Sequence, residues 1–152
     1  MIYCSESIKD WTSHPLSLEQ FLSEQKRDWG RTDFNRCEFL KKDDIIKIYT
    51  DRDLYCDEKP TQSQCDQERE QCVRHLANIF KDDKTFREDQ IYVASRHGFV
   101  PAKNKWKISF RCFVRGYSIR MGDIPKLLSF YGQDEFWDLE PYHSRQKLNI
   151  PG

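Results

Sequence analysis

The sequence of 152 residues predicts one domain of the α+β class, with mixed or antiparallel sheets and helices packed against them. Three observations predict it. Residues 105–113 alternate between apolar and polar side chains, which is the period of a β-strand. Runs rich in β-branched and aromatic residues at 45–50 and 90–94 indicate two further strands. Helical spacing of apolar residues between these strands then favours an α+β arrangement.

The first element that we expect is a helix near the N-terminus, after an irregular segment at 1–14. Ser17 and Gln20 have the spacing of a capping box, and the helix should end near Trp29 and Gly30. The residues that follow the box at helical spacing are Leu18, Phe21, Leu22 and Gln25. We interpret this helix as a packing element.

The strand predicted at 45–50 ends in two acidic residues, Asp51 and Asp53. Residues two apart in a strand share a face, so both carboxylates would project together from the strand end. Neighbouring carboxylates repel each other unless a cation lies between them, and Mg²⁺ is held by one or two carboxylates plus substrate phosphates. The pair predicts a metal site for phosphate chemistry. The alternative is a polar strand end followed by a solvated turn.

Residues 57–64, with Pro60, should form a loop before a helix at about 65–81. The residues predicted to face the core from this helix are Cys72, Val73, Leu76, Ile79 and Phe80. Its charged side should be solvated.

The chain has six cysteines and no Cys-x-x-Cys pair, which favours free, buried thiols in a reducing compartment. Cys56, Cys65, Cys72 and His75 form an alternative zinc-binding set, although the first gap is not a typical ligand spacing.

The strand at 105–113 is expected to pair with that at 90–94, because Gly98 and Pro101 favour a turn between them. One of its faces is apolar and carries Trp106, Ile108, Phe110 and Cys112, of which Cys112 is predicted to lie in the core. The other face carries Lys105, Lys107, Ser109 and Arg111. A row of positive side chains with one serine hydroxyl among them is suited to bind the oxygens of a polyphosphate. The alternative is the solvated face of an antiparallel sheet.

A helix should begin at Asp123, with Pro125 in its first turn, and bury Ile124, Leu127, Leu128 and Phe130. Asp138 follows two aromatic residues. A third acid beside the pair at 51 and 53 would complete the ligands of a two-metal site. The alternative role of Asp138 is to cap a helix or a turn.

These segments, in this order, resemble the archaeo-eukaryotic primase superfamily, and in particular the primase domains of large DNA viruses. The resemblance covers roughly residues 40–152. The family has an acidic pair in a hydrophobic strand, matched at 45–53, and a lysine-x-serine-x-histidine strand, matched at 107–111. It then has an aspartate followed by a tyrosine and a basic stretch, matched at 137–152.

The resemblance implies a primase-polymerase catalytic core of RRM-like type, which performs template-directed nucleotidyl transfer in DNA replication. Its partners would be a DNA template, nucleoside triphosphates and a helicase domain or subunit. It implies that Asp51, Asp53 and Asp138 bind Mg²⁺ or Mn²⁺, and that Lys107, Ser109 and Arg111 hold the triphosphate. By the same resemblance, Tyr142 and Arg145 lie around the nucleotide and its sugar, and Arg96 and His97 near the nucleotide or template.

The chain departs from the family pattern at two positions and at its end. Arg111 stands where histidine is usual; it can grip phosphate but cannot exchange a proton near neutral pH. Asn149 stands where the family usually has arginine. The sequence stops at Gly152, which leaves open a trimmed N-terminal part of a longer primase-helicase or a compact natural form.

The composition has 25 basic and 25 acidic residues and no net charge, which argues against a general nucleic-acid coating protein. The residues from 96 to 120 nevertheless include seven cations and no acid, and this stretch is the best candidate for contact with a nucleic-acid backbone. No apolar run approaches the ~20 residues of a membrane span, and the N-terminus does not resemble a secretory signal. We therefore expect an intracellular protein, in the host cytoplasm or nucleus if viral, with no membrane partner.

Two rival functions remain open at this stage. The first is a non-catalytic nucleic-acid-binding domain that retains the primase fold, which the residues at 111 and 149 favour. The second is a metal-dependent nuclease, which would leave the row of Lys107, Ser109 and Arg111 unexplained because hydrolysis needs no grip on a triphosphate.

Overall fold

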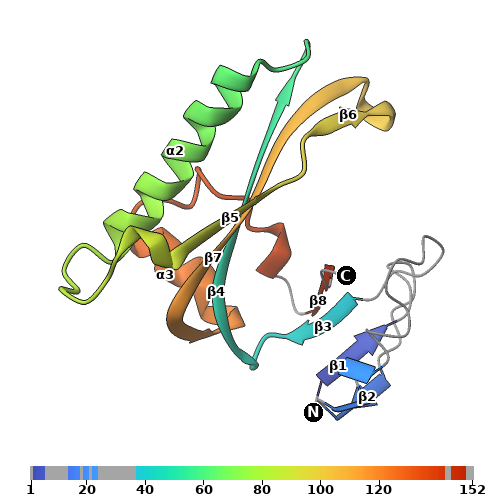
Figure 1. Cartoon of the computed structure of the whole chain (residues 1–152), viewed down its shortest axis with the longest axis vertical. Coiled ribbons are helices and arrows are strands. Elements are labelled where there is room, and N and C mark those ends of the chain that lie inside the picture. Colours follow the sequence, from blue (N-terminus) through green and yellow to red (C-terminus); the bar gives the residue numbers. More distant parts are fainter. Residues whose placement is uncertain are drawn as a thin grey trace.

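The structure is a computed structural model that describes residues 2–5, 14–17, 19–20, 22–23, 37–142 and 145–149. It confirms the α+β class, because two antiparallel sheets are combined with helices (Figure 1). The strands are β1 (Ile2–Ser5), β2 (His14–Leu16), β3 (Cys37–Lys41), β4 (Ile45–Cys56), β5 (Ile91–Ser95), β6 (Gly98–Val100), β7 (Lys105–Arg120) and β8 (Arg145–Asn149). The α-helices are α2 (Gln62–Ile79) and α3 (Ile124–Phe130), and the 3₁₀-helix Glu140–Tyr142 is η4.

The larger sheet has the order β4-β7-β5, with β6 also paired to β7. The predicted antiparallel pairing of the segments at 90–94 and 105–113 is confirmed. Both long strands extend beyond the predicted ranges, and β4 continues through the acidic pair to Cys56. The expectation that Asp51 and Asp53 lie at the strand end is therefore wrong. Backbone pairing with β7 continues past them, so both acids lie inside the strand.

Helix α2 covers one face of this sheet (Figure 1). It begins three residues earlier than predicted, because Thr61 and Gln64 form a capping box: the Thr61 hydroxyl accepts from the Gln64 N–H at 3.2 Å, and the Gln64 side chain accepts from the Thr61 N–H at 2.8 Å. The predicted core face is confirmed for Cys72, Leu76, Ile79 and Phe80, and Val73 is partly buried. The strand residues buried in the same core include Ile48, Ile108, Phe110, Cys112 and Val114.

The smaller sheet has the order β2-β1-β3-β8, and the pairing of Lys41 with Arg145 brings part of the stretch at 137–152 into this sheet. The expectation of an irregular segment at 1–14 is wrong for Ile2–Ser5 and for His14, which pair as strands through contacts distant in the sequence. The capping box of Ser17 and Gln20 is confirmed by two hydrogen bonds, of 2.9 and 3.2 Å. Leu18, Phe21, Gln25 and the predicted helix end at 29–30 lie outside the described residues, and Leu22 is exposed.

Helix α3 follows the prediction with two differences. Ile124 and Leu128 are fully buried and Pro125 stands in the first turn, but the Asp123 side chain makes no capping hydrogen bond. Phe130 is 82% exposed, so its predicted burial is wrong. Two residues turn an α-helix by about 200°, which directs Phe130 away from the side that buries Leu128. None of the described helices is long and apolar enough to cross a membrane.

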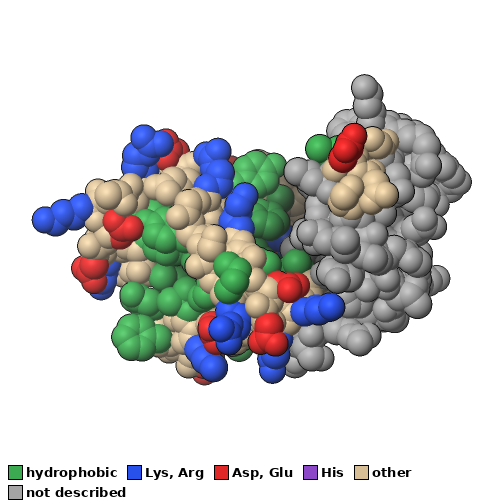
Figure 2. Space-filling model, turned by 90° about the horizontal axis from the view of Figure 1, so that it is seen from below, with side chains coloured by type: hydrophobic (Ala, Val, Ile, Leu, Met, Phe, Trp, Pro, Cys, Tyr) green, Lys and Arg blue, Asp and Glu red, His purple; other side chains and the backbone are tan. Residues whose placement is uncertain are grey.

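The surface seen from below mixes acidic and basic side chains around hydrophobic ones (Figure 2). This view agrees with the balanced composition of the chain. It directs attention to local arrangements of charge on the central sheet.

Candidate active site on the open face of the central sheet

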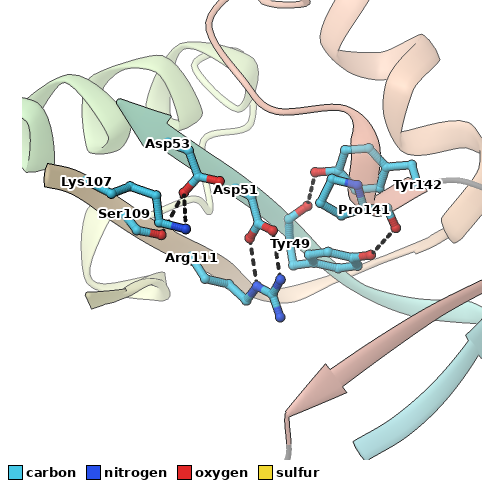
Figure 3. Close-up of polar contacts among 8 residues, drawn as sticks. All are labelled: Tyr49, Asp51, Asp53, Lys107, Ser109, Arg111, Pro141 and Tyr142. Carbon is cyan, nitrogen blue, oxygen red and sulfur yellow. Dashed lines mark hydrogen bonds and ion pairs between the residues drawn. The ribbon is translucent and has the colours of Figure 1, made fainter. Parts of the chain in front are cut away.

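The face of the sheet opposite α2 carries the predicted acidic pair of Asp51 and Asp53 together with the predicted row of Lys107, Ser109 and Arg111 (Figure 3). Successive residues of a strand alternate between faces, and antiparallel partners share one. On this open face β4 places Tyr49, Asp51, Asp53 and Tyr55 opposite Phe113, Arg111, Ser109 and Lys107 of β7. The prediction that the two acids share a face is thus confirmed, and they directly oppose the cationic row.

Asp51 and Arg111 form a bidentate ion pair across the two strands. The Arg111 Nε donates to Asp51 Oδ1 at 2.6 Å, and Nη2 donates to Oδ2 at 2.7 Å. The Asp51 side chain is only 13% exposed, and the Arg111 side chain is 29% exposed. Burial acts to lower the pKa of Arg111, but the hydrogen bonds and charge of Asp51 outweigh it, so the net pKa is raised. The Arg111 guanidinium therefore keeps its positive charge, which strengthens its two hydrogen bonds to Asp51.

Asp53 is held more loosely than Asp51 by side chains of β7. The Ser109 hydroxyl donates to its Oδ1 at 2.7 Å, whereas the Lys107 ammonium stays 4.0 Å from that oxygen. A charge pair at this distance and partial exposure contributes little to stability. Lys107 can consequently turn toward another anion at small cost.

Asp138 joins the acidic pair from a segment distant in sequence. Its N–H donates to the Asp51 carbonyl at 2.8 Å in an isolated antiparallel bridge at the edge of β4. Burial raises the pKa of the Asp138 carboxyl, a hydrogen bond from the Glu140 N–H opposes this, and the charges of Asp53 and Asp51 raise it further. That hydrogen bond, at 3.1 Å, also fulfils the alternative role of Asp138 as a turn cap. The negative charges of Asp53 and Asp51 thus oppose ionisation of Asp138.

Asp138 is positioned by Arg52, which the sequence analysis did not single out. Alternation directs Arg52, between the two acids, toward the face that α2 covers. There its Nη1 donates to the Phe136 carbonyl at 2.6 Å, its guanidinium lies 4.0 Å from the Phe136 ring centre, and its Nε lies 3.4 Å from Glu68 Oε2. Arg52 therefore ties the segment before Asp138 to both β4 and α2. Its place between two site residues was the available signal.

Tyr49 and Tyr142 form the floor at one end of the open face. The Tyr142 hydroxyl donates to the Tyr49 carbonyl at 2.6 Å, and the Tyr49 hydroxyl donates to the Pro141 carbonyl at 3.0 Å. Burial raises the pKa of both hydroxyls, so both remain neutral donors. Tyr142 therefore lies near Asp51 and Arg111, but its hydroxyl is already hydrogen-bonded to the Tyr49 carbonyl. Tyr49 was missed, although it precedes Asp51 by two residues and so shares its face.

The other predicted residues are arranged differently. Arg96 is exposed at the end of β5, where its N–H donates to the Ser109 carbonyl at 2.9 Å. His97 accepts the Ser109 N–H through Nδ1 at 3.0 Å, and its ring lies edge-on to Phe110, which belongs to the covered face. His97 is thus turned from the acids. Arg145 lies in β8, and its side chain is outside the described part of the chain.

The three acids are suitable ligands for a divalent metal, but their side chains are not arranged to hold one in the structure. Three neighbouring carboxylates are the oxygen ligands that Mg²⁺ and Mn²⁺ prefer, and their mutual repulsion would be relieved by a cation. However, both Asp51 oxygens accept from Arg111, and among the described residues no three His, Cys, Asp or Glu side chains are grouped to hold a metal. Metal binding by these acids therefore stays a prediction from the sequence.

The alternative zinc set is not grouped either. His75 stacks on Phe136 with ring centres 3.7 Å apart, and its Nδ1 bonds the Gln71 carbonyl. Cys65 and Cys72 are buried as free thiols, and so is Cys112, as predicted. Cys72 contacts Cys112 through a side-chain hydrogen bond that, with burial, raises the pKa of its thiol. These thiols are packing residues of the core.

Comparison with known proteins adds no relative: no protein-family model, curated protein or solved structure matches the chain. The structure defines the chain as an α+β domain in which acidic residues of β4 lie opposite polar and cationic residues of β7 on the sheet face away from α2. Its membership of the primase superfamily stays a prediction from the motifs.

Proposed function

We propose that the chain is a catalytic domain of primase-polymerase type, which adds nucleotides to a strand paired with a DNA template. One observation carries the proposal: the backbone of Asp138 pairs with that of Asp51 at the edge of β4, and β7 places Ser109 and Arg111 opposite the acidic pair, with Lys107 next in the row. A metal-bound triphosphate needs carboxylates for the cation and fixed cations for the phosphates, side by side. The motif order of the sequence supports the same assignment.

In this proposal, Asp51, Asp53 and Asp138 hold Mg²⁺ or Mn²⁺. The ions would lower the pKa of a 3′-hydroxyl and neutralise charge on the leaving pyrophosphate. The chain itself binds and orients the triphosphate: Arg111 matches phosphate oxygens with its planar fork, Lys107 supplies a mobile charge, and Ser109 donates a hydrogen bond. Their contribution is positioning and electrostatics.

Arg111 then exchanges one anion for another during substrate binding. In the structure it satisfies Asp51, and with substrate it would turn to the triphosphate while the cation takes its place at Asp51. Both arrangements are charge-assisted, and neither leaves a desolvated charge without a partner. This exchange gives Arg111 a role that a neutral histidine at the same position could not fill, since one imidazole offers no bidentate fork.

The test is template-dependent incorporation of labelled nucleotide with Mg²⁺ and with Mn²⁺. Asp51→Ala and Asp138→Ala should each lower the rate by at least about 10²-fold, equivalent to about 2.7 kcal/mol of transition-state stabilisation. The matched control is Asp134→Ala, an exposed acid in the same segment as Asp138, which should retain full activity. Circular dichroism and thermal midpoints show whether each variant folds. Undiminished incorporation by folded Asp51→Ala would refute the proposal.

A second candidate, a non-catalytic binding domain, is favoured by one observation: Arg111 engages both oxygens of Asp51. Such a domain would hold a nucleotide through its cations alone. Equilibrium binding of a nucleoside triphosphate with and without Mn²⁺ separates the two functions. The catalytic domain should require the ion for tight binding, and a pure binding domain should not.

A further inference from the structure

The open face continues past the candidate active site onto a projecting hairpin. In Figure 1, β6 and the adjoining ends of β4 and β7 project at the end of the sheet away from β3. Across these strands Tyr55 opposes Lys107, and Lys107 opposes Gly98. Tyr55 is two residues from Asp53 on the same face, which corresponds to about 7 Å along the strand. The hairpin thus extends the floor of the site.

Tyr55 presents an aromatic ring on this extension. The residue is 42% exposed, and the Lys103 ammonium lies 4.2 Å from its ring centre. Beside Lys107, a Cβ built on Gly98 would meet nothing within 4 Å, so the surface there is open. Arg96 is exposed next to Ser109. We name the surface formed by Tyr55, Gly98 and Lys103 the hairpin platform.

The cations near the hairpin platform come from β6, β7 and the turn that joins them, whereas the nearby acids Asp53 and Asp57 come from β4 and the residue after it. The chain has no acid between residues 96 and 120, which include β6, β7 and the turn that joins them. The nearby acid Asp57 is paired with Lys105 at 3.5 Å, at the strand end. A cationic surface with an accessible ring is complementary to a strand that has anionic phosphates and unpaired bases.

The contact between Lys103 and Tyr55 does not block a base. A cation–π contact at an exposed site is weaker than the stacking of a base on an aromatic side chain. A base can therefore displace the ammonium from the ring. The displaced Lys103 then remains within reach of the phosphate that follows that base.

We propose that the hairpin platform binds single-stranded nucleic acid, with one base stacked on Tyr55 and a phosphate paired with Lys103. That this strand is the template rests on the proposed function, but binding itself does not. The opposite side of the same hairpin provides a matched control. There Phe99 is 45% exposed, its ring centre lies 5.5 Å from that of Trp106, and Lys59 lies over Trp106 at 5.7 Å.

The experiment measures fluorescence anisotropy of a labelled oligodeoxythymidylate without nucleotide and with EDTA. Tyr55→Ala should weaken binding by about 5- to 100-fold, as expected for one lost stacked base. Tyr55→Phe should restore it, because the ring alone is needed. Phe99→Ala should bind within about twofold of wild type, since its ring faces the other side. Lys103→Ala should also reduce the slope of log affinity against log salt by about 0.7, unlike Lys59→Ala.

Three results would overturn the proposal: wild-type affinity in Tyr55→Ala, an equal loss in Phe99→Ala, or competition by inorganic polyphosphate that equals that of the oligonucleotide. The last result would indicate a surface for any polyanion. Failure of the proposed function is separately visible. If Tyr55→Ala loses affinity for the oligonucleotide but the wild type shows no incorporation, the proposed function fails and this inference stands. If the wild type incorporates nucleotide and Tyr55→Ala does so with an unchanged template KM, this inference fails and the proposed function stands.

Discussion

The two faces of the central sheet are built from the same two strands but behave oppositely. On β7, Ile108, Phe110 and Cys112 are almost fully buried under α2, while the residues between them carry the polar site. A shift of one residue in the pairing of β4 with β7 would exchange these faces. The difference shows that the core sets the register, and that the register brings Asp51 to Arg111.

The faces also differ in the forces that stabilise them. Full burial of one large apolar side chain contributes about 1.5–3 kcal/mol. An ion pair with partial exposure contributes less, because desolvation offsets much of the attraction. We therefore expect substitutions on the covered face to change stability, and those on the open face to change binding and activity. Four predictions test this division, from the largest expected effect on stability to the smallest.

Leu76→Ala on α2 should lower the free energy of unfolding by about 2–5 kcal/mol, because Leu76 is fully buried and truncation leaves a cavity. Urea denaturation measures the loss. Phe130→Ala on α3 is the matched control and should change stability by no more than about 0.5 kcal/mol, since its ring is exposed. Equal effects of both variants would contradict the assigned core.

The pair of Asp51 and Arg111 should show a coupling energy of about 1–2 kcal/mol in a double-mutant cycle. The variants are Asp51→Asn, Arg111→Met and their combination, compared by urea denaturation without divalent ions. Each single change leaves a partly buried charge without its partner, which the double change removes. A coupling below about 0.3 kcal/mol would mean that the pair does not form in solution and that Asp51 is available to a cation.

Thr50→Val should raise the free energy of unfolding by about 1 kcal/mol. The Thr50 hydroxyl is fully buried on the covered face, where the described residues offer it no hydrogen-bond partner. Valine has nearly the same shape and removes the cost of burying that polar group. Thermal denaturation measures the shift, and destabilisation would show that the hydroxyl has a partner after all.

Asp138→Asn should increase stability at pH 7 by a few tenths of a kcal/mol, because solvent screens much of the repulsion felt by this partly exposed carboxyl. The raised pKa of Asp138 means that the folded state binds its proton more tightly than the unfolded state. Stability therefore falls as the pH rises from the unfolded pKa through the folded pKa, and the loss persists above it. Asparagine retains the acceptor for the Glu140 N–H.

The control for this prediction is acid pH. Below the unfolded pKa the carboxyl is protonated in both states, so wild type and Asp138→Asn should have equal urea midpoints. A variant that is less stable than wild type at pH 7 would contradict the repulsion among the three carboxylates.

Local pattern was a good guide where structure depends on near neighbours. The alternation at 105–113 predicted both faces of β7 correctly, and helical spacing identified the core side of α2. The sequence contains the capping box of Thr61 and Gln64, but the predicted loop at 57–64 includes both residues. The predicted strands are too short, because the ends of β4 and β7 are held as strands by pairing with each other, and the two segments are distant in the sequence. The exposure of Phe130 was readable from its angle relative to Leu128.

For this protein, the sequence alone determined which residues share a face and which chemistry they carry, because the two-residue and 3.6-residue periods are local properties of the backbone. Only the tertiary structure decided that Asp138 joins β4 beside Asp51, that Arg52 turns to α2, and that Arg111 closes on Asp51. These arrangements depend on strand register and on contacts between segments distant in sequence. No local period contains that information, since packing of the whole core selects it.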